Sequence, residues 1–327
     1  ELPVTEEPDR EYFGEPVEEH LHDLESHDLV RKTARGWVYS GRARAAEAVR
    51  LDGMPGETFR IVCKGKLLET MDRGQAYREA HRGALMLHQG ETYLVTGMDL
   101  ETHTIRVTET DVDYYTQPLK ETDLTILSTL EQKNINGWRC AFGDVEVNER
   151  FTGYKVKRGD TIIGIEPLDL PPLTFRTRAF WITPSPEVMQ DLAVPDADPA
   201  GGLHGAEHAL IAMMPLHVLC DRWDIGGLSS PAYGDEGEPV IFVYDACEGG
   251  IGLAEKGYCL IMDLITSAFQ MVRDCPCEDG CPSCIHSPKC GNDNQPLDKG
   301  AAGLILGRLC GGLPVRGRGT VTSVTEA

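Results

Sequence analysis

The chain has 327 residues, of which 41% are hydrophobic, and this length is enough for two or three domains that each bury a core. Its 52 acidic and 31 basic residues give a formal net charge of -21, which argues against a broad positive surface of the kind that coats nucleic acid. The chain contains neither a run of eighteen apolar residues nor a signal peptide, so we expect a soluble, cytoplasmic protein with no membrane partner.

The first part of the chain predicts a small module made of helices and a short β-ribbon. Apolar residues at positions 17, 21, 24, 29 and 30 approximate a helical stripe, and residues 36–41 read as a short strand or turn. Helices followed by a small ribbon are typical of a winged-helix module, which we assign to residues 1–57. The first residue is glutamate rather than methionine, and the opening segment resembles the middle of a domain, so we expect a larger parent protein.

The charge of this module changes sign along the chain. Residues 1–28 hold eleven carboxylates and one arginine, whereas residues 31–50 hold six lysines or arginines and one glutamate. A local basic cluster can contact phosphates even in an acidic protein, with an aromatic residue such as Trp37 or Tyr39 stacking on a base. The predicted nucleic-acid-binding residues are Arg31, Lys32, Arg35, Arg42 and Arg44. Two alternatives stay open: these side chains pair with the preceding acidic segment, and Trp37 packs inside the module.

The middle of the chain, residues 58–190, predicts a β-rich domain with one short helix near residues 75–80. Apolar and polar residues alternate with period two in several short segments, which glycine and aspartate turn signals separate. Four prolines between residues 184 and 199 then indicate a loop or a domain boundary. The strand candidates are residues 92–95, 105–107, 151–154, 161–165 and 175–181.

The last part of the chain, residues 191–327, predicts a mostly helical domain. Helical patterns cover residues 205–220, 253–272 and 297–309, and residues 239–245 read as a buried strand. A cysteine-rich loop lies between the last two helices. The predicted fold class is therefore α+β, with a winged-helix module, a β-rich middle region and a helical C-terminal metal-binding domain.

Five cysteines within the sixteen residues 275–290 indicate a metal site in that last domain. Four thiolates that converge from a short loop containing proline and glycine form a tetrahedral site for zinc. Four protein ligands leave no open position for water, so we expect a structural metal and assign no catalytic residue. The predicted ligands are Cys275, Cys277, Cys281 and Cys284.

Two questions about this site stay open in the sequence. One of Cys275, Cys277 and Cys290 is in excess of a tetrahedral set, and we keep Cys290 as the alternative ligand. An iron-sulfur cluster also takes four thiolates, although we favour zinc. The six other cysteines stand singly among apolar neighbours, which indicates small core residues in a reducing, intracellular compartment rather than a disulfide framework.

A second metal motif is much less specific. The segment His204-Gly-Ala-Glu207-His208 matches the H-x-x-E-H pattern of a family of zinc peptidases, in which two histidines hold zinc and the glutamate polarises water. Neighbouring glycines place the segment at the start of a helix, so we favour polar residues that bond to nearby segments. A metallopeptidase stays an alternative, and it requires a second metal ion.

Two further segments have polar or glycine-rich patterns. Residues 244–253 form a strand that ends in a glycine-rich turn, which can cradle a phosphate or let a helix pack closely on the strand, and we favour packing. Asp221, Arg222 and Asp224 predict a buried ion-pair network. Nowhere does the chain contain G-x-x-x-x-G-K-[ST], so it cannot by itself be an ordinary NTP-driven motor.

Several separate motifs occur in the order that they have in one family of helicases. The chain resembles, over essentially its whole length, the C-terminal half of the MrfA-type (mitomycin repair factor) superfamily 2 DEAD/DEAH-box DNA helicases. The motifs are Tyr77-Arg-Glu-Ala-His-Arg-Gly-Ala, Leu87-His-Gln-Gly-Glu-Thr-Tyr, Val112-Asp-Tyr-Tyr-Thr-Gln117, Leu216-His-Val-Leu-Cys-Asp-Arg, Tyr244-Asp with Gly249-Gly250-Ile-Gly252-Leu, and Cys275-Pro-Cys through Cys290-Gly-Asn.

The resemblance implies two RecA-like motor domains ahead of Glu1 in the same polypeptide, with ATP and magnesium as their cofactors. In this family the motors couple ATP hydrolysis to 3′ to 5′ translocation and DNA unwinding, with a proposed part in DNA repair. The resemblance also implies a winged helix and a zinc-binding domain whose four cysteines correspond to the predicted ligands.

We therefore expect an accessory region that guides single-stranded or tailed duplex DNA. The strong acidity departs from what is usual in a DNA-binding module. A free-standing, non-enzymatic, zinc-stabilised protein-interaction module is the alternative.

Overall fold

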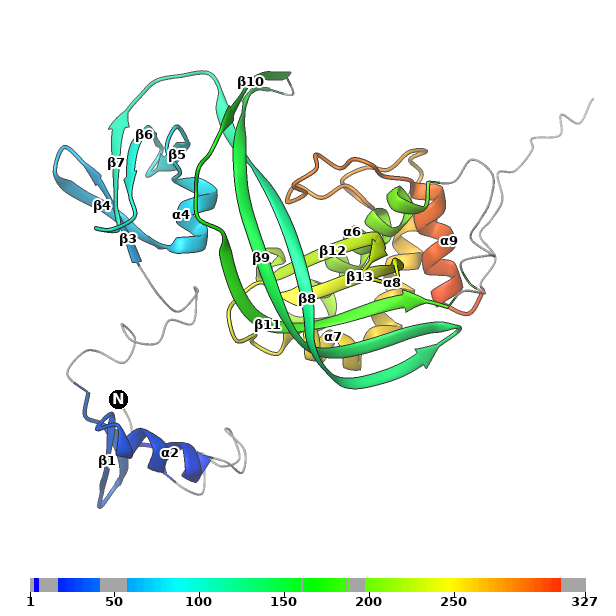
Figure 1. Cartoon of the computed structure of the whole chain (residues 1–327), viewed down its shortest axis with the longest axis horizontal. Helices are drawn as coiled ribbons and strands as arrows, with labels where there is room; N and C mark the ends of the chain where they lie inside the picture. The colour runs from blue at the N-terminus through cyan, green and yellow to red at the C-terminus, as the bar shows by residue number, and fades with distance from the viewer. Residues whose placement is uncertain are drawn as a thin grey trace, which may run out of the picture. The chain divides into compact units, whose positions relative to one another are not determined.

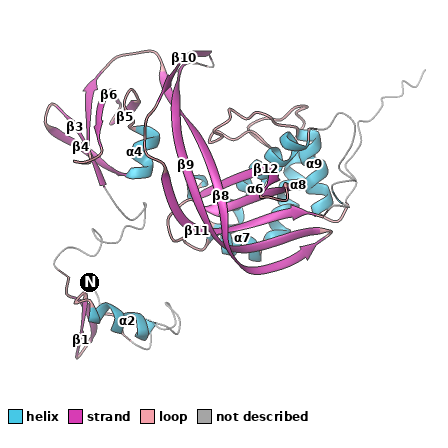
Figure 2. Cartoon of the chain, in the orientation of Figure 1, coloured by secondary structure: helices cyan, strands magenta, loops and turns pink. Residues whose placement is uncertain are grey.

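The structure is a computed structural model that describes residues 3–5, 17–41, 58–159, 161–185, 188 and 198–312. It contains both helices and sheets, which confirms the predicted α+β class (Figure 2). The chain forms two compact units, Glu1–Pro55 and Gly56–Ala327. No helix among the described residues is long and apolar enough to cross a membrane.

The first unit is a helix followed by a two-stranded antiparallel hairpin, α2 (Val17–Ser26), β1 (Val30–Thr33) and β2 (Gly36–Tyr39). Trp37 is only 2% exposed and packs against Val17 and Leu21 of the helix, so it belongs to the core of this unit and is not presented for base stacking. The winged-helix assignment stays a prediction, because residues 6–16 and 42–57 lie outside the described part.

A five-stranded sheet opens the second unit, with strand order β4-β3-β7-β6-β5 (Figure 1). Strands β3 and β7 pair in parallel, and the other three pairs are antiparallel, among the residues that the structure describes. Helix α4 (Arg73–Glu79) begins where the carboxylate of Asp72 accepts the backbone N–H of Gln75 at 2.8 Å, which satisfies a free donor at the helix start. The strands are β3 (Thr58–Cys63), β4 (Lys66–Asp72), β5 (Leu85–His88), β6 (Glu91–Asp99) and β7 (Thr104–Glu109).

A six-stranded antiparallel sheet forms the rest of the scaffold, in the order β10-β9-β11-β13-β12, with β8 paired along β9. Asn136 and Gly137 join β8 to β9, and both have positive φ, as the tight turn of a two-residue hairpin requires. One edge of β9 pairs with β8, and the other edge pairs first with β11 and then with β10. The strands are β8 (Tyr115–Ile135), β9 (Trp138–Arg158), β10 (Thr161–Pro167), β11 (Leu173–Pro184), β12 (Ile225–Tyr233) and β13 (Glu238–Asp245).

Four helices and the cysteine loop share one core with this sheet. Trp138 and Phe180 come from β9 and β11, while Leu210, Leu264 and Leu306 come from three of the helices. Residues 58–190 and 191–327, which we predicted as separate domains, therefore contribute strands to the same sheet. The helices are α6 (Pro199–Val218), α7 (Leu253–Cys259), α8 (Ile261–Asp274) and α9 (Lys299–Leu309), and a short 3₁₀ turn, η1 (Arg222–Asp224), precedes β12.

Helix α6 begins six residues earlier than predicted, at Pro199 rather than residue 205. Asp198 caps it by accepting the backbone N–H of Ala200 at 3.0 Å, and proline is well suited to the first turn because its missing N–H needs no partner there. His204 and His208 therefore lie within the helix and not at its start, which corrects our expectation for this segment.

Candidate metal centre

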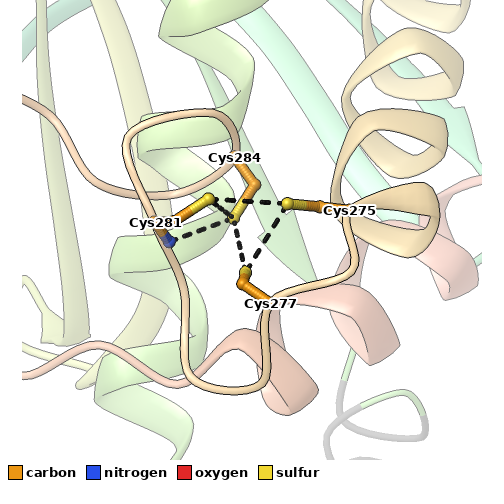
Figure 3. A group of neighbouring side chains, drawn as sticks. All are labelled: Cys275, Cys277, Cys281 and Cys284. Atoms are coloured by element: carbon orange, nitrogen blue, oxygen red, sulfur yellow. Dashed lines mark hydrogen bonds between the residues drawn. The ribbon is translucent and has the colours of Figure 1, made fainter.

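The four predicted cysteine ligands come together at the end of α8 (Figure 3). Cys275 is the C-cap residue just after the helix, and the loop that follows returns Cys277, Cys281 and Cys284 to the same point. The Sγ of Cys275 lies 3.5 Å from those of Cys277 and Cys281, and the Sγ of Cys284 lies 3.5 Å from that of Cys277 and 3.8 Å from that of Cys281.

These sulfur-sulfur distances fit a zinc ion. A tetrahedron with Zn–S bonds of about 2.3 Å has edges of about 3.8 Å between its sulfur atoms. The four side chains therefore need to move apart only by tenths of an ångström to hold the ion, and they lie around a common centre in Figure 3. Such a set has no open coordination position, so the arrangement is that of a structural site.

Backbone contacts fix the shape of the loop. The N–H of Cys281 donates to the Sγ of Cys284 at 3.3 Å, which suits a sulfur that carries negative charge. Gly280 has a φ of +115°, and a Cβ there would lie 2.7 Å from the Cγ1 of Ile285, so only glycine fits without displacing a core side chain. Lys299 donates from its Nζ to the carbonyl of Cys275 at 2.8 Å and also to that of Cys277.

The cysteine thiols have different proton affinities. A hydrogen bond from the backbone of Ser283 is the largest of the effects that lower the pKa of Cys281 to about 7, whereas burial raises the pKa of Cys284 to about 12. Metal binding requires thiolates, so it must displace protons from the site, most of all from Cys284.

Cys290, the alternative ligand, lies away from this cluster. Its Sγ is 3.4 Å from the Nε2 of His204, and the two residues form a second group with His208. Glu207 does not belong to either group of potential metal ligands in the described part of the chain. Its buried carboxylate lies against Gly227 of β12, where a Cβ would come within 2.6 Å of its Oε1, so it is not placed to polarise a water between the histidines, as the peptidase hypothesis requires.

The predicted nucleic-acid-binding residues are only partly described. Arg31, Lys32 and Arg35 are exposed on the β1–β2 hairpin, and the Nζ of Lys32 lies 5.2 Å from the ring centre of Trp37. Within the described residues, Arg31 and Arg35 make no ion pair with the acidic helix α2. Arg42 and Arg44 lie outside the described residues.

The glycine-rich turn after β13 does not leave a phosphate cradle free. The fully buried carboxylate of Asp245 accepts the backbone N–H groups of Ile251, Gly252, Leu253 and Ala254 at 2.6 to 3.3 Å. These are the donors that would otherwise bind an anion at the start of α7. The phosphate reading therefore has no support, but close packing does not explain these glycines either. Gly249 and Gly252 have φ of +81° and +86° with open space at their Cβ positions, so they supply a backbone conformation that other residues rarely adopt.

The expected buried ion-pair network at residues 221–224 is wrong. Asp221 and Trp223 are exposed, and no residue of this turn is fully buried. Asp221 accepts the N–H of Trp223 at 2.8 Å and Asp224 accepts the N–H of Asp221 at 2.8 Å, so the carboxylates cap η1. Among the single cysteines, Cys259 is exposed, which also corrects our expectation of a core position.

Sequence reasoning missed two features near this centre. Lys299 holds the cysteine loop, but nothing in the sequence distinguishes it from any lysine at a helix start. Trp223 is 56% exposed and lies beneath two cations, Arg78 at 5.6 Å and Lys289 at 4.7 Å from its ring. These partners are far apart in sequence, so the fold alone brings them together.

Comparisons with known proteins agree with this geometry. Residues 206–285 match the family model of the MrfA Zn-binding domain, which identifies the metal of the four-cysteine centre as zinc rather than an iron-sulfur cluster. The chain is 30% identical over 291 residues to the uncharacterized ATP-dependent helicase YprA of Bacillus subtilis, with 85% of this chain and 38% of YprA aligned.

Two more comparisons extend the match. An uncharacterized protein of Methanocaldococcus jannaschii, MJ1572.1, is 40% identical over 110 residues, which cover 33% of this chain and 98% of that protein. The crystal structure of the DUF1998 helicase MrfA bound to DNA superposes with a TM-score of 0.57 and 27% identity, over 90% of this chain and 39% of MrfA. The chain thus spans less than half the length of the helicases it matches. It belongs to the family of proteins that carry the MrfA Zn-binding domain.

Proposed function

We propose that this chain is the zinc-bearing accessory region of an ATP-dependent DNA helicase. The motor domains, with their ATP and magnesium sites, then lie elsewhere in the same cytoplasmic polypeptide. The observation that carries the proposal is the similarity to YprA and MrfA along 85% and 90% of this chain, at 30% and 27% identity. The parent enzyme would unwind DNA in the 3′ to 5′ direction and serve DNA repair.

Zinc has a structural role in this proposal. The four thiolates of Cys275, Cys277, Cys281 and Cys284 would complete the coordination of the ion and close the loop between α8 and α9. Cys284 is only 3% exposed and lies in the same core as both helices. The ion would thereby hold the helical face of the six-stranded sheet in the shape that contacts the motors.

The hairpin of the first unit would guide single-stranded or tailed duplex DNA. Arg31, Lys32 and Arg35 expose their charges there, and Arg42 and Arg44 follow closely in sequence. Local basic sites of this kind reconcile phosphate contact with a net charge of -21.

The DNA-binding proposal can be tested on the chain itself. We would measure the affinity of the double variant Arg31→Glu with Arg35→Glu for a fluorescent single-stranded oligonucleotide over a series of salt concentrations. Each lost phosphate contact lowers the slope of log K against log salt by about 0.7. The pair Lys64→Glu with Lys66→Glu provides a matched control, because Lys64 lies in the turn after β3 and Lys66 is the first residue of β4, and both are exposed.

We expect weaker binding and a flatter slope for the Arg31 and Arg35 variant alone. An unchanged affinity and slope would remove these residues from the interface. If the unaltered chain does not bind the oligonucleotide, the result would instead favour the alternative of a zinc-stabilised module that binds other proteins.

A further inference from the structure

We propose that the chain holds a second metal ion, bound by His204 and His208 of α6 and by Cys290 of the loop before α9. Zinc is the ion that best suits two imidazoles and one thiolate. The fourth coordination position would be open to water or to a small exogenous ligand. The family model matches residues 206–285, so two of the three ligands lie outside the segment that defines the four-cysteine domain.

The spacing of the donor atoms fits one ion. The three ligand atoms lie within 4.8 Å of one another, and the Sγ of Cys290 is 3.4 Å from the Nε2 of His204. A tetrahedral zinc with bonds of about 2.0 Å to nitrogen and 2.3 Å to sulfur places such a pair about 3.5 Å apart. The rings of His204 and His208 have centres 4.3 Å apart, because residues four apart on a helix share a face.

Both histidines are fixed in the tautomer that a metal needs. The Nδ1 of His204 lies 2.8 Å from the carbonyl oxygen of Pro296, and the Nδ1 of His208 lies 2.7 Å from that of Ile285. A carbonyl only accepts, so each Nδ1 carries a proton and donates it. A neutral ring then has its lone pair on Nε2, which is the arrangement found around histidines that bind metal ions.

The thiol of Cys290 is also positioned to bind the ion. Cys290 is only 9% exposed, and its Sγ accepts the backbone N–H of Asn294 at 3.2 Å. A buried sulfur that faces an imidazole lone pair and a backbone donor is well suited to carry negative charge toward a cation. The loop that presents it is ordered by a bond from the N–H of Ser287 to the Oδ1 of Asn294 at 2.7 Å.

Three protein ligands distinguish this site from the four-cysteine centre. Within the described residues, no carboxylate and no further histidine or cysteine completes the group. An open position normally allows a metal to bind water or substrate, and His204 is only partly buried, so solvent has a route to the ion. Glu207 is not part of the group, and its carboxylate lies against Gly227 of β12, so this is a ligand-accepting site and not a peptidase centre.

Metal content measured on the purified chain tests the proposal. We expect two zinc ions per chain in the unaltered protein and one in Cys290→Ser and in His204→Ala. His217→Gln is the matched control, because His217 lies on the same helix but pairs with Ser267 at 3.0 Å. It should keep both ions. Cys281→Ser should lose the other ion, which separates the two centres.

Cobalt substitution provides a second readout. It also shows whether a variant is folded, because a folded variant keeps the spectrum of the four-thiolate centre. Cobalt bound by one thiolate and two imidazoles absorbs differently from cobalt bound by four thiolates, so Cys290→Ser should remove one spectral component and keep the four-thiolate component. Azide should shift only the component that Cys290→Ser removes, since that ion alone has an open position. One zinc ion per unaltered chain, with no change in Cys290→Ser or His204→Ala, would overturn the proposal. A four-thiolate cobalt spectrum that shows no second component would do the same.

Discussion

Lys299, the first residue of α9, donates a hydrogen bond of 2.8 Å to the backbone carbonyl of Cys275, the C-cap residue of α8. The same ammonium group also binds the carbonyl of Cys277. One positive charge therefore joins two helices and lies beside the four thiolates. Because a tetrathiolate zinc site carries net negative charge, Lys299 stabilises both the loop and its metal.

Replacing Lys299 should weaken the four-cysteine centre. We expect Lys299→Met to lower the free energy of unfolding by about 1–3 kcal/mol, since two carbonyls lose charge-assisted hydrogen bonds, and to speed the release of zinc to a chelator. Thermal unfolding and a chromogenic chelator measure these effects. Lys256→Met is the control, because Lys256 is exposed on α7. Equal zinc release from both variants would contradict this role.

Removal of zinc should loosen the helical face and spare the five-stranded sheet. The cysteine loop shares its core with α8 and α9, whereas the five-stranded sheet has a core of its own around Phe59, Ile61 and Tyr77. A metal site of this type contributes directly to folding energy. Hydrogen exchange in the presence of a strong chelator should lose protection in α8 and α9 first. Uniform loss across both regions, or no loss at all, would show that the metal does not act locally.

The carboxylate of Asp245 should stabilise the fold. Asp245→Asn removes the negative charge and replaces one acceptor by a donor, so buried N–H groups at the start of α7 lose their partner. We expect a loss of about 2–3 kcal/mol in chemical denaturation. Asp235→Asn, in an exposed turn, should have almost no effect. Wild-type stability of Asp245→Asn would mean that these donors do not depend on the carboxylate.

Acid should destabilise the protein partly through His81. This ring is fully buried, and burial lowers its pKa below the usual 6.5. The neutral form is therefore favoured in the folded state, and its stabilising effect is complete above pH 6.5 and is lost as the pH falls through the lowered pKa. His81→Gln should flatten the dependence of stability on pH between about 7 and 5. Parallel pH curves for the wild type and His81→Gln would refute this.

The four-cysteine group was predictable because a metal loop is a local structure. Its ligands lie within ten residues, and their spacing with Gly280 nearly determines the turn. The α+β class followed from equally local patterns of period two and period 3.6. The long hairpin was harder, because only the short segment 151–154 stood out within the 21 residues of β9. In β9, buried residues interrupt the alternation, since both faces of its first half are covered.

The second group of ligands could not be assembled from the sequence. His204 and His208 were recognised as a pair, but Cys290 lies more than eighty residues away and had been assigned to the other cysteines. Only the packing of α6 against the loop before α9 brings the three together. The buried carboxylate of Asp245 and the two cations around Trp223 were hidden for the same reason. Residues that meet only through the fold have no characteristic spacing along the chain, so the sequence alone does not predict such contacts.

The most direct test of the helicase proposal is the sequence of the reading frame upstream of Glu1. We expect it to contain a G-x-x-x-x-G-K-[ST] motif and an acidic D-E-x-H type motif, which together bind ATP and magnesium in a motor. That result would join this zinc-bearing region to an ATP-driven enzyme. A start codon close to Glu1 with no motor ahead of it would contradict the proposal and leave a free-standing zinc module.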